Sequence, residues 1–125
     1  MNALTIQEAA QTTDWSPRML RYIERAGLIE PQRSGAGYRL YGPGELQRLR
    51  TLRELATRFG IGLSEIGFAK RLRRDEELAG AVDAWFEAAP RRPADVPPAE
   101  WLRWEQDKHT KLLAFARATP ATTHA

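Results

Sequence analysis

The sequence predicts a mainly α fold, in which several short helices are accompanied by one small β-hairpin. Apolar residues recur every three or four positions over most of the chain, which is the period of a helix. Glycine and proline divide these stretches into short segments. A single alternating segment, "YRLY" at 38–41, follows the turn sequence "SGAG", and together they predict the hairpin.

The first predicted helix is short. Thr5 and Glu8 have the spacing of a capping box, so a helix is expected over about 6–11. Its inward-facing residues would be Ile6, Ala9 and Ala10. The connection "TTDW" is tight, and Trp15 is expected to pack beneath the helix that follows. Two short helices joined in this way form a helix-turn-helix in outline.

The second helix, predicted within "SPRMLRYIERAGL" at 16–28, has an unusual outer face. Ser16 and Gly27 can cap its two ends. One stripe along it holds three guanidinium groups and a phenol, from Arg18, Arg21, Tyr22 and Arg25. The opposite, inward stripe would be formed by Met19, Leu20, Ile23 and Ala26. Such a cationic row suits a polyanion, although the arginines alternatively pair with Glu24 on a solvated face.

The segment 28–41 is expected to form the hairpin, because Pro31 excludes a helix and "SGAG" supplies a flexible turn. Leu40 would turn toward the core. The residues expected on the tip and the return strand are Arg33, Tyr38 and Arg39. These side chains would extend the basic surface of the second helix.

Two further helices are predicted in the N-terminal portion. One spans about 43–59, and its core face is the row Leu46, Leu49, Leu52, Leu55 or Ala56, and Phe59. The next begins after Ser64, its expected N-cap. Its inward residues would be Ile66 and Leu72. The order helix, helix, hairpin, helix, helix predicts a winged helix-turn-helix domain over 1–74.

Residues 75–118 are expected to form a second, helical region. Two helices, over about 75–89 and 99–118, flank a connector at 90–98 that contains four prolines. Apolar residues on these helices would form either a dimer interface or a ligand pocket, namely Leu78, Val82, Trp85, Phe86, Trp101, Trp104, Leu112 and Phe115. In the last helix, Glu105 is an alternative to Trp104 in the inward row, which includes Lys108. A disordered tail is expected over 119–125.

The two portions differ in charge. Residues 1–74 contain 13 lysines and arginines against 7 acidic residues, a net charge of +6, whereas residues 75–125 carry a net charge of −3. A basic portion joined to an acidic one indicates an anion-binding module with an appended region.

The composition excludes several classes of function. Without cysteine, this chain has no disulfide, thiolate metal site or thiol nucleophile. His109, expected on a polar helix face, and His124, in the tail, lack the spaced partners of a metal site. No catalytic constellation or phosphate-binding loop is present, so we expect neither an enzyme nor a bound cofactor. No stretch resembles a membrane span or a signal peptide, which predicts a cytoplasmic protein.

Four motifs together resemble the DNA-binding domain of the mercury-resistance-regulator (MerR) family. They are "RMLRYIERAGLI-P-R" at 18–33, "GYRLY" at 37–41, the "EL-RL" helix and "GIGLSEI", and the resemblance covers about residues 4–72. It implies a dimer that binds double-stranded DNA, with the second helix in the major groove and the hairpin, or wing, on phosphates. Many members also underwind and bend a promoter to activate it.

The resemblance assigns roles to individual residues. Those expected to contact DNA are Arg18, Arg21, Tyr22, Arg33, Tyr38 and Arg39. Arg18, near the start of the second helix, would read a base edge, whereas Arg21 and Tyr22 match the family's phosphate-contacting pair. Tyr38 and Arg39 match the "GYR" of the wing.

The chain departs from the family pattern in three respects. Met19 stands where threonine is frequent and Ile23 where tyrosine is frequent, so Ile23 is expected to pack in the core. The helix that begins near Asp75 reaches only about 22 Å, at roughly 1.5 Å per residue, before Pro90 ends it. That is short for the family's dimerising coiled coil. The metal-binding cysteines of the family are absent.

Three functions follow from these observations. The first is a transcriptional regulator that binds specific double-stranded DNA. The others are an excisionase-like architectural protein that bends DNA, and a protein-interaction module, for example for a sigma factor. We expect a homodimer held by both C-terminal helices, because one helix and one wing cover too little DNA for tight specific binding. An unidentified small-molecule effector would bind among the C-terminal aromatic residues, whose packing on each other or across the dimer is the favoured alternative.

Overall fold

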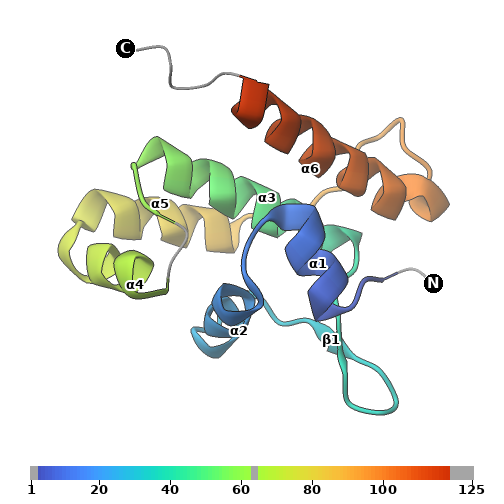
Figure 1. Ribbon diagram of the computed structural model, residues 1–125, viewed down its shortest axis with the longest axis horizontal. Coiled ribbons are helices and arrows are strands. Elements are labelled where there is room, and N and C mark those ends of the chain that lie inside the picture. Colours follow the sequence, from blue (N-terminus) through green and yellow to red (C-terminus); the bar gives the residue numbers. More distant parts are fainter. Residues whose placement is uncertain (1–2, 63–64, 119–125) are drawn as a thin grey trace.

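The computed structural model describes residues 3–62 and 65–118 (Figure 1). Helices form most of it, and one antiparallel hairpin extends from one side. The elements in chain order are α1 (Ile6–Thr13), α2 (Pro17–Arg25), β1 (Gln32–Arg33), β2 (Arg39–Leu40), α3 (Pro43–Arg58), α4 (Glu65–Arg74), α5 (Glu76–Glu87) and α6 (Trp101–Ala118). A short 3₁₀ turn, Pro98–Glu100, leads into α6. The mainly α class and the order of elements are confirmed.

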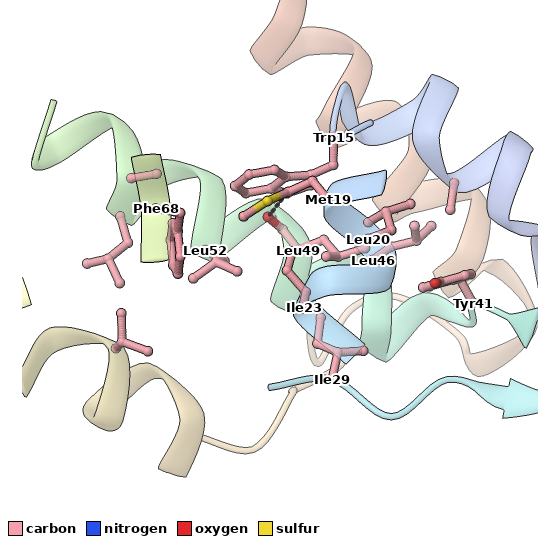
Figure 2. Packing of buried hydrophobic residues seen from close by; sticks show 14 of the residues in the cluster. Trp15, Met19, Leu20, Ile23, Ile29, Tyr41, Leu46, Leu49, Leu52 and Phe68 are labelled. Atoms are coloured by element: carbon pink, nitrogen blue, oxygen red, sulfur yellow. Dashed lines mark hydrogen bonds between the residues drawn. The ribbon is translucent and has the colours of Figure 1, made fainter. Parts of the chain in front are cut away.

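Helix α3 is the central element of the core. It contacts α1, α5 and α6, and its leucine row is buried as the sequence predicts. Figure 2 shows Leu46, Leu49 and Leu52 facing side chains of α2 and Phe68 of α4. Burying a leucine side chain contributes roughly 2 kcal/mol to folding. Phe59, at the end of the row, is only partly buried.

The local signals of α1 and α2 act as the sequence predicts. The capping box of Thr5 and Glu8 is formed, and α1 runs two residues further than expected, to Thr13. The Thr13 hydroxyl donates to the carbonyl oxygen of Ala9 at 2.8 Å, which lets this polar residue lie in the core. Ala26 is exposed, contrary to the prediction, because it is the C-cap residue just beyond the last turn of α2.

The core continues into α4 and α5. Phe68 of α4 is fully buried, and Leu72 packs partly against the core. Ser64, the predicted N-cap, and the side chain of Ile66 lie outside the described residues. Leu78 and Val82 of α5 belong to the same buried cluster as the leucines of α3. The expected boundary at residue 74 is therefore crossed by one continuous core.

Helix α6 folds back on α3 and α1 through a face that the sequence predicted only in part, by its alternative of Glu105 (Figure 1). Glu105 is fully buried; its carboxylate binds Arg50 at 3.3 Å and accepts from the Trp101 indole at 3.1 Å. His109, expected on a polar face, is also fully buried, so that prediction was wrong. Lys108 and Phe115 are exposed, which corrects the predicted inward row.

The connector at 90–98 contains no α-helix, as its prolines predict, but it turns at 94–96, where the Val96 N–H donates to the Pro93 carbonyl oxygen at 3.1 Å. Gln47 holds its start against α3. The Gln47 amide donates to the carbonyl oxygen of Arg91 at 2.6 Å and accepts from the Arg91 N–H at 2.7 Å.

None of the helices in the described part of the chain has the length and apolar character needed to cross a membrane.

Burial controls the protonation of His109. Its Nε2 donates to the Leu46 carbonyl oxygen at 2.8 Å, while Nδ1 is buried without a hydrogen-bond partner. Desolvation lowers the pKa of His109 to about 4, and the charges of Arg50 and Arg53 act in the same direction. At neutral pH the buried imidazole is therefore uncharged.

The first prediction concerns acid stability. Below pH 6.5 the unfolded chain takes up a proton at His109 that the folded chain does not bind until about pH 4. The free energy of unfolding should therefore fall between pH 6.5 and 4, by about 3 kcal/mol from this residue. Urea titrations over this range measure the free energy of unfolding of the parent and of His109→Gln. The difference between the two pH profiles isolates the effect of His109, since all other groups titrate in both proteins. Parallel pH profiles would contradict it.

Candidate nucleic-acid interface

The outer face of α2 is a row of cationic side chains on a helix that the core holds in place. Arg18, Arg21 and Arg25 are exposed, while the inner residues Met19, Leu20 and Ile23 are buried against α3 and α4. Ser16 caps the helix by accepting from the Met19 N–H at 3.0 Å, and Gly27 ends it at φ +77°. The predicted arginine stripe is thus presented to solvent.

Tyr22 lies at the edge of this row and is partly buried. Its ring meets Phe68 of α4 edge-on, with 6.2 Å between centroids and 71° between planes. Ile23 is 1% exposed and Met19 is fully buried, so both depart from the family pattern on the core side of the helix. The prediction that Ile23 packs in the core is confirmed.

The turn between α1 and α2 is fixed by α3. Asp14 adopts a left-handed backbone (φ 65°), and Trp15 is buried with its indole N–H donating to the Leu49 carbonyl oxygen at 3.1 Å (Figure 2). Arg53 of α3 donates to the Thr13 carbonyl oxygen at 3.1 Å and pairs with Asp14 at 3.4 Å. These contacts set the angle at which α2 leaves the turn.

The wing is a short hairpin with an exposed aromatic residue. Its ladder holds two residue pairs, Gln32 with Leu40 and Arg33 with Arg39. Tyr38 is 71% exposed beside the turn, and its N–H donates to the Ser34 hydroxyl at 3.1 Å. Leu40 is only partly buried at the base, less than the sequence suggests.

Tyr41 anchors the base of the wing. It is 1% exposed, and its backbone exchanges two hydrogen bonds with Leu4, at 2.8 and 2.7 Å. Burial of the phenol raises the pKa of Tyr41 to about 12. The group therefore stays neutral and serves as an anchor rather than as a titrating site.

Glu24 joins α2 to the wing, and sequence reasoning missed this role. Its two carboxylate oxygens bind the wing arginines, Oε2 to Arg33 Nη2 at 2.8 Å and Oε1 to Arg39 Nε. The sequence suggested Glu24 only as a partner for arginines on its own helix. The sequence shows Glu24 as an acidic residue beside a stripe of arginines, which could have indicated an ion pair. It does not indicate which arginines bind Glu24, because these lie 9 and 15 residues away.

The C-terminal residues expected to form an interface or a pocket are distributed over different surroundings. Leu78 and Val82 are 0% and 3% exposed inside the core of their own chain. The Trp85 indole N–H donates to the Arg48 carbonyl oxygen at 3.0 Å, and the Arg48 guanidinium stacks on its ring. Trp101, Trp104 and Leu112 are partly buried, while Phe86 and Phe115 are 44% and 69% exposed.

Three of these aromatic residues line surface hollows, two of which share Glu45 and Pro90 in their walls. Trp101 lines one of about 600 Å³, Trp104 one of about 310 Å³ and Phe86 one of about 290 Å³. Within the described residues, no group of three histidine or acidic side chains is arranged to hold a metal ion.

Comparison with known proteins identifies relatives of the N-terminal half. Residues 4–68 match the MerR HTH family regulatory proteins. An uncharacterized HTH-type transcriptional regulator of Pseudomonas aeruginosa is 35% identical over 79 residues, 62% of this chain and 59% of the relative. Over the same share of this chain, the heavy metal-dependent transcription regulator 2 of Rhizobium meliloti is 35% identical and the mercuric resistance operon regulatory protein of Bacillus cereus 34%.

The chain spans just over half the length of these relatives, 53% and 52% in the latter two. No solved structure matches it. The family match covers α1, α2, the wing and α3, together with the first residues of α4, which are the elements that build the basic surface. The chain therefore belongs to the family of MerR helix-turn-helix regulatory proteins.

Proposed function

We propose that this chain is a transcriptional regulator that binds specific double-stranded DNA through α2 and the wing. The supporting observation is the exposed row of Arg18, Arg21 and Arg25 on a helix held by the core, next to a wing that carries two more arginines and an exposed tyrosine. In Figure 1, α2 and the wing lie on the side of the molecule opposite α6.

The two elements suit different parts of a duplex. The major groove is about 12 Å wide and admits a helix, in which an arginine can bind both O6 and N7 of a guanine. Arg18, at the second residue of α2, is the proposed base reader. Arg21 and Tyr22 would bind phosphates beside it, as would Tyr38 and the arginines of the wing.

The alternative functions are separated by salt dependence and by sequence specificity. A protein that neutralises phosphates loses affinity steeply as salt rises, whereas a module that binds a sigma factor has no such requirement. Bending alone does not identify an architectural protein, since many regulators of the family also bend DNA, but an architectural protein of low specificity would bind a selected and a scrambled duplex alike. Gel shifts on these two duplexes at two salt concentrations distinguish the three.

The second prediction separates base reading from phosphate binding. Arg18→Ala should cost about 1–3 kcal/mol on a selected duplex and relax the preference at one base pair. Arg21→Ala should weaken binding to all sequences alike and reduce the salt slope by about one. Fluorescence anisotropy on a duplex selected from a random library, and on a scrambled one, measures both. Parent-like binding by both variants would show that the surface is misassigned.

We also propose that the chain acts as a homodimer. A single module covers only about 600–1,000 Å² at DNA, so specific binding calls for two copies on symmetric half-sites. Leu78 and Val82 are not available for this contact, because the chain's own core buries them. Phe86 on α5 and Phe115 on α6 are the exposed apolar candidates. Trp104 lines a hollow that shares no residue with those of Trp101 and Phe86, which favours packing over one effector pocket common to all of the aromatic residues.

The third prediction tests that interface. The variant Phe86→Ser with Phe115→Ser should sediment as a folded monomer at micromolar concentration and bind its selected duplex much more weakly, because large exposed aromatic residues dominate such contacts. Tyr38→Ser is the matched control, since it removes an equally exposed aromatic residue from the wing and should leave the dimer intact. A double variant that remains a dimer in analytical ultracentrifugation would refute the assignment.

The fourth prediction concerns metals, because two of the similar regulators are named for metal-dependent or mercuric regulation. Without cysteine, this chain lacks the thiolate ligands that such ions prefer. Calorimetry of the chain with zinc or copper should give no dissociation constant below about 1 μM. Selective sites with nitrogen and sulfur donors bind these ions more tightly than that. Submicromolar binding of either ion would contradict this prediction.

A further inference from the structure

We propose that Glu24 is a positioning residue for DNA recognition, because its carboxylate holds the wing at a fixed place relative to α2. The inference rests on the proposed DNA binding. An acidic residue between two sets of arginines would thus align them for DNA, one set on α2 and the other on the wing.

The wing cannot fix its own orientation. Its ladder consists of two residue pairs, and an isolated two-stranded hairpin is marginally stable in water. The bonds between Leu4 and Tyr41 hold only its base, and the bonds of Ser34 connect residues of the tip to each other. Glu24, in the last turn of α2, contacts the ladder between the base and the tip, at Arg33 and Arg39.

The charges explain why a carboxylate is needed there. Arg33 and Arg39 are directly opposite each other in the ladder, and like charges in that arrangement destabilise a hairpin. One oxygen of Glu24 accepts from each arginine, so the carboxylate relieves this repulsion and ties both strands to α2. Arg33 also donates from Nη1 to the Gly37 carbonyl oxygen at 3.2 Å, which orients its guanidinium group toward the turn.

The arginines remain able to bind phosphate in this arrangement. A guanidinium group has five N–H donors, and the bond to Glu24 uses one Nε donor of Arg39. The Arg33 side chain is 47% exposed and that of Arg39 27%. Glu24 therefore aligns the two groups without enclosing them, and α2 and the wing can approach DNA as one rigid surface.

Two variants test the role of Glu24. Glu24→Gln keeps the size of the side chain but loses the charge and one acceptor oxygen, while Glu24→Asp keeps the charge on a shorter arm that cannot reach both strands. Both should lower the ratio of affinities for a library-selected and a scrambled duplex by about tenfold, a loss comparable to one mismatched base pair. Binding of the scrambled duplex by Glu24→Gln should be unchanged or tighter, since a negative charge has been removed.

A second measurement needs no DNA. In ¹⁵N relaxation experiments on the full chain, the order parameters of residues 33–39 should fall in both variants, while those of α2 stay at parent values. Glu30→Gln is the matched control, because it removes one charge from an exposed residue just before the wing and should change neither the order nor the affinity ratio.

The outcomes separate this inference from the function on which it rests. A parent chain that binds no duplex overturns both. If the parent discriminates between duplexes, unchanged order parameters in the variants would overturn the inference alone. So would Glu24→Asp behaving like the parent, or Glu24→Gln gaining the same affinity for both duplexes, because either result means that only charge matters.

Discussion

Rings from three different segments donate hydrogen bonds to backbone carbonyls of α3, and the placement of the other elements depends on these contacts. Trp15 donates to Leu49 at 3.1 Å, Trp85 of α5 to Arg48 at 3.0 Å and His109 of α6 to Leu46 at 2.8 Å. Each ring buries a large surface and satisfies its own N–H in one contact. The three acceptors lie in one stretch of α3. That stretch therefore places three elements, namely α5, α6 and the turn that precedes α2.

The basic surface depends on this packing. A helix of nine residues such as α2 is not stable in isolation, and its inner residues hold it in place by packing against α3. The same contacts turn its arginines outward. The wing is attached separately, through Tyr41 at its base and Glu24 at its middle. The specificity of DNA recognition by this surface would depend on the angle between α2 and the wing, which these two attachments fix.

Local signals made much of this fold predictable. A capping box determines where α1 begins, and a proline in the first turn and Gly27 at positive φ determine where α2 begins and ends. These signals act within a few residues. The leucine period of α3 identified its core face for the same reason. The exposed arginines of α2 were likewise predictable, because they lie opposite that helix's apolar stripe.

The remaining contacts depend on residues far apart in the chain. The sequence left Glu105 open as an alternative to Trp104 and placed His109 on the surface, because their partners on α3, Arg50 and the Leu46 carbonyl oxygen, lie 55 and 63 residues away. The aromatic residues of α6 allowed more than one inward face, and these polar partners decide between them. Glu24 is a similar case, since only the folded hairpin brings two arginines to it.

The use of backbone acceptors by the three rings has a consequence for how this sequence can change. A carbonyl oxygen persists whatever side chain its residue carries, so replacements at Arg48 need not abolish the acceptor that Trp85 uses. The donors have less freedom, because a replacement for an indole or an imidazole must supply both an N–H of similar reach and the bulk of a ring. Related chains should therefore tolerate more substitutions on the outward positions of α3 than at the three ring residues that dock on it.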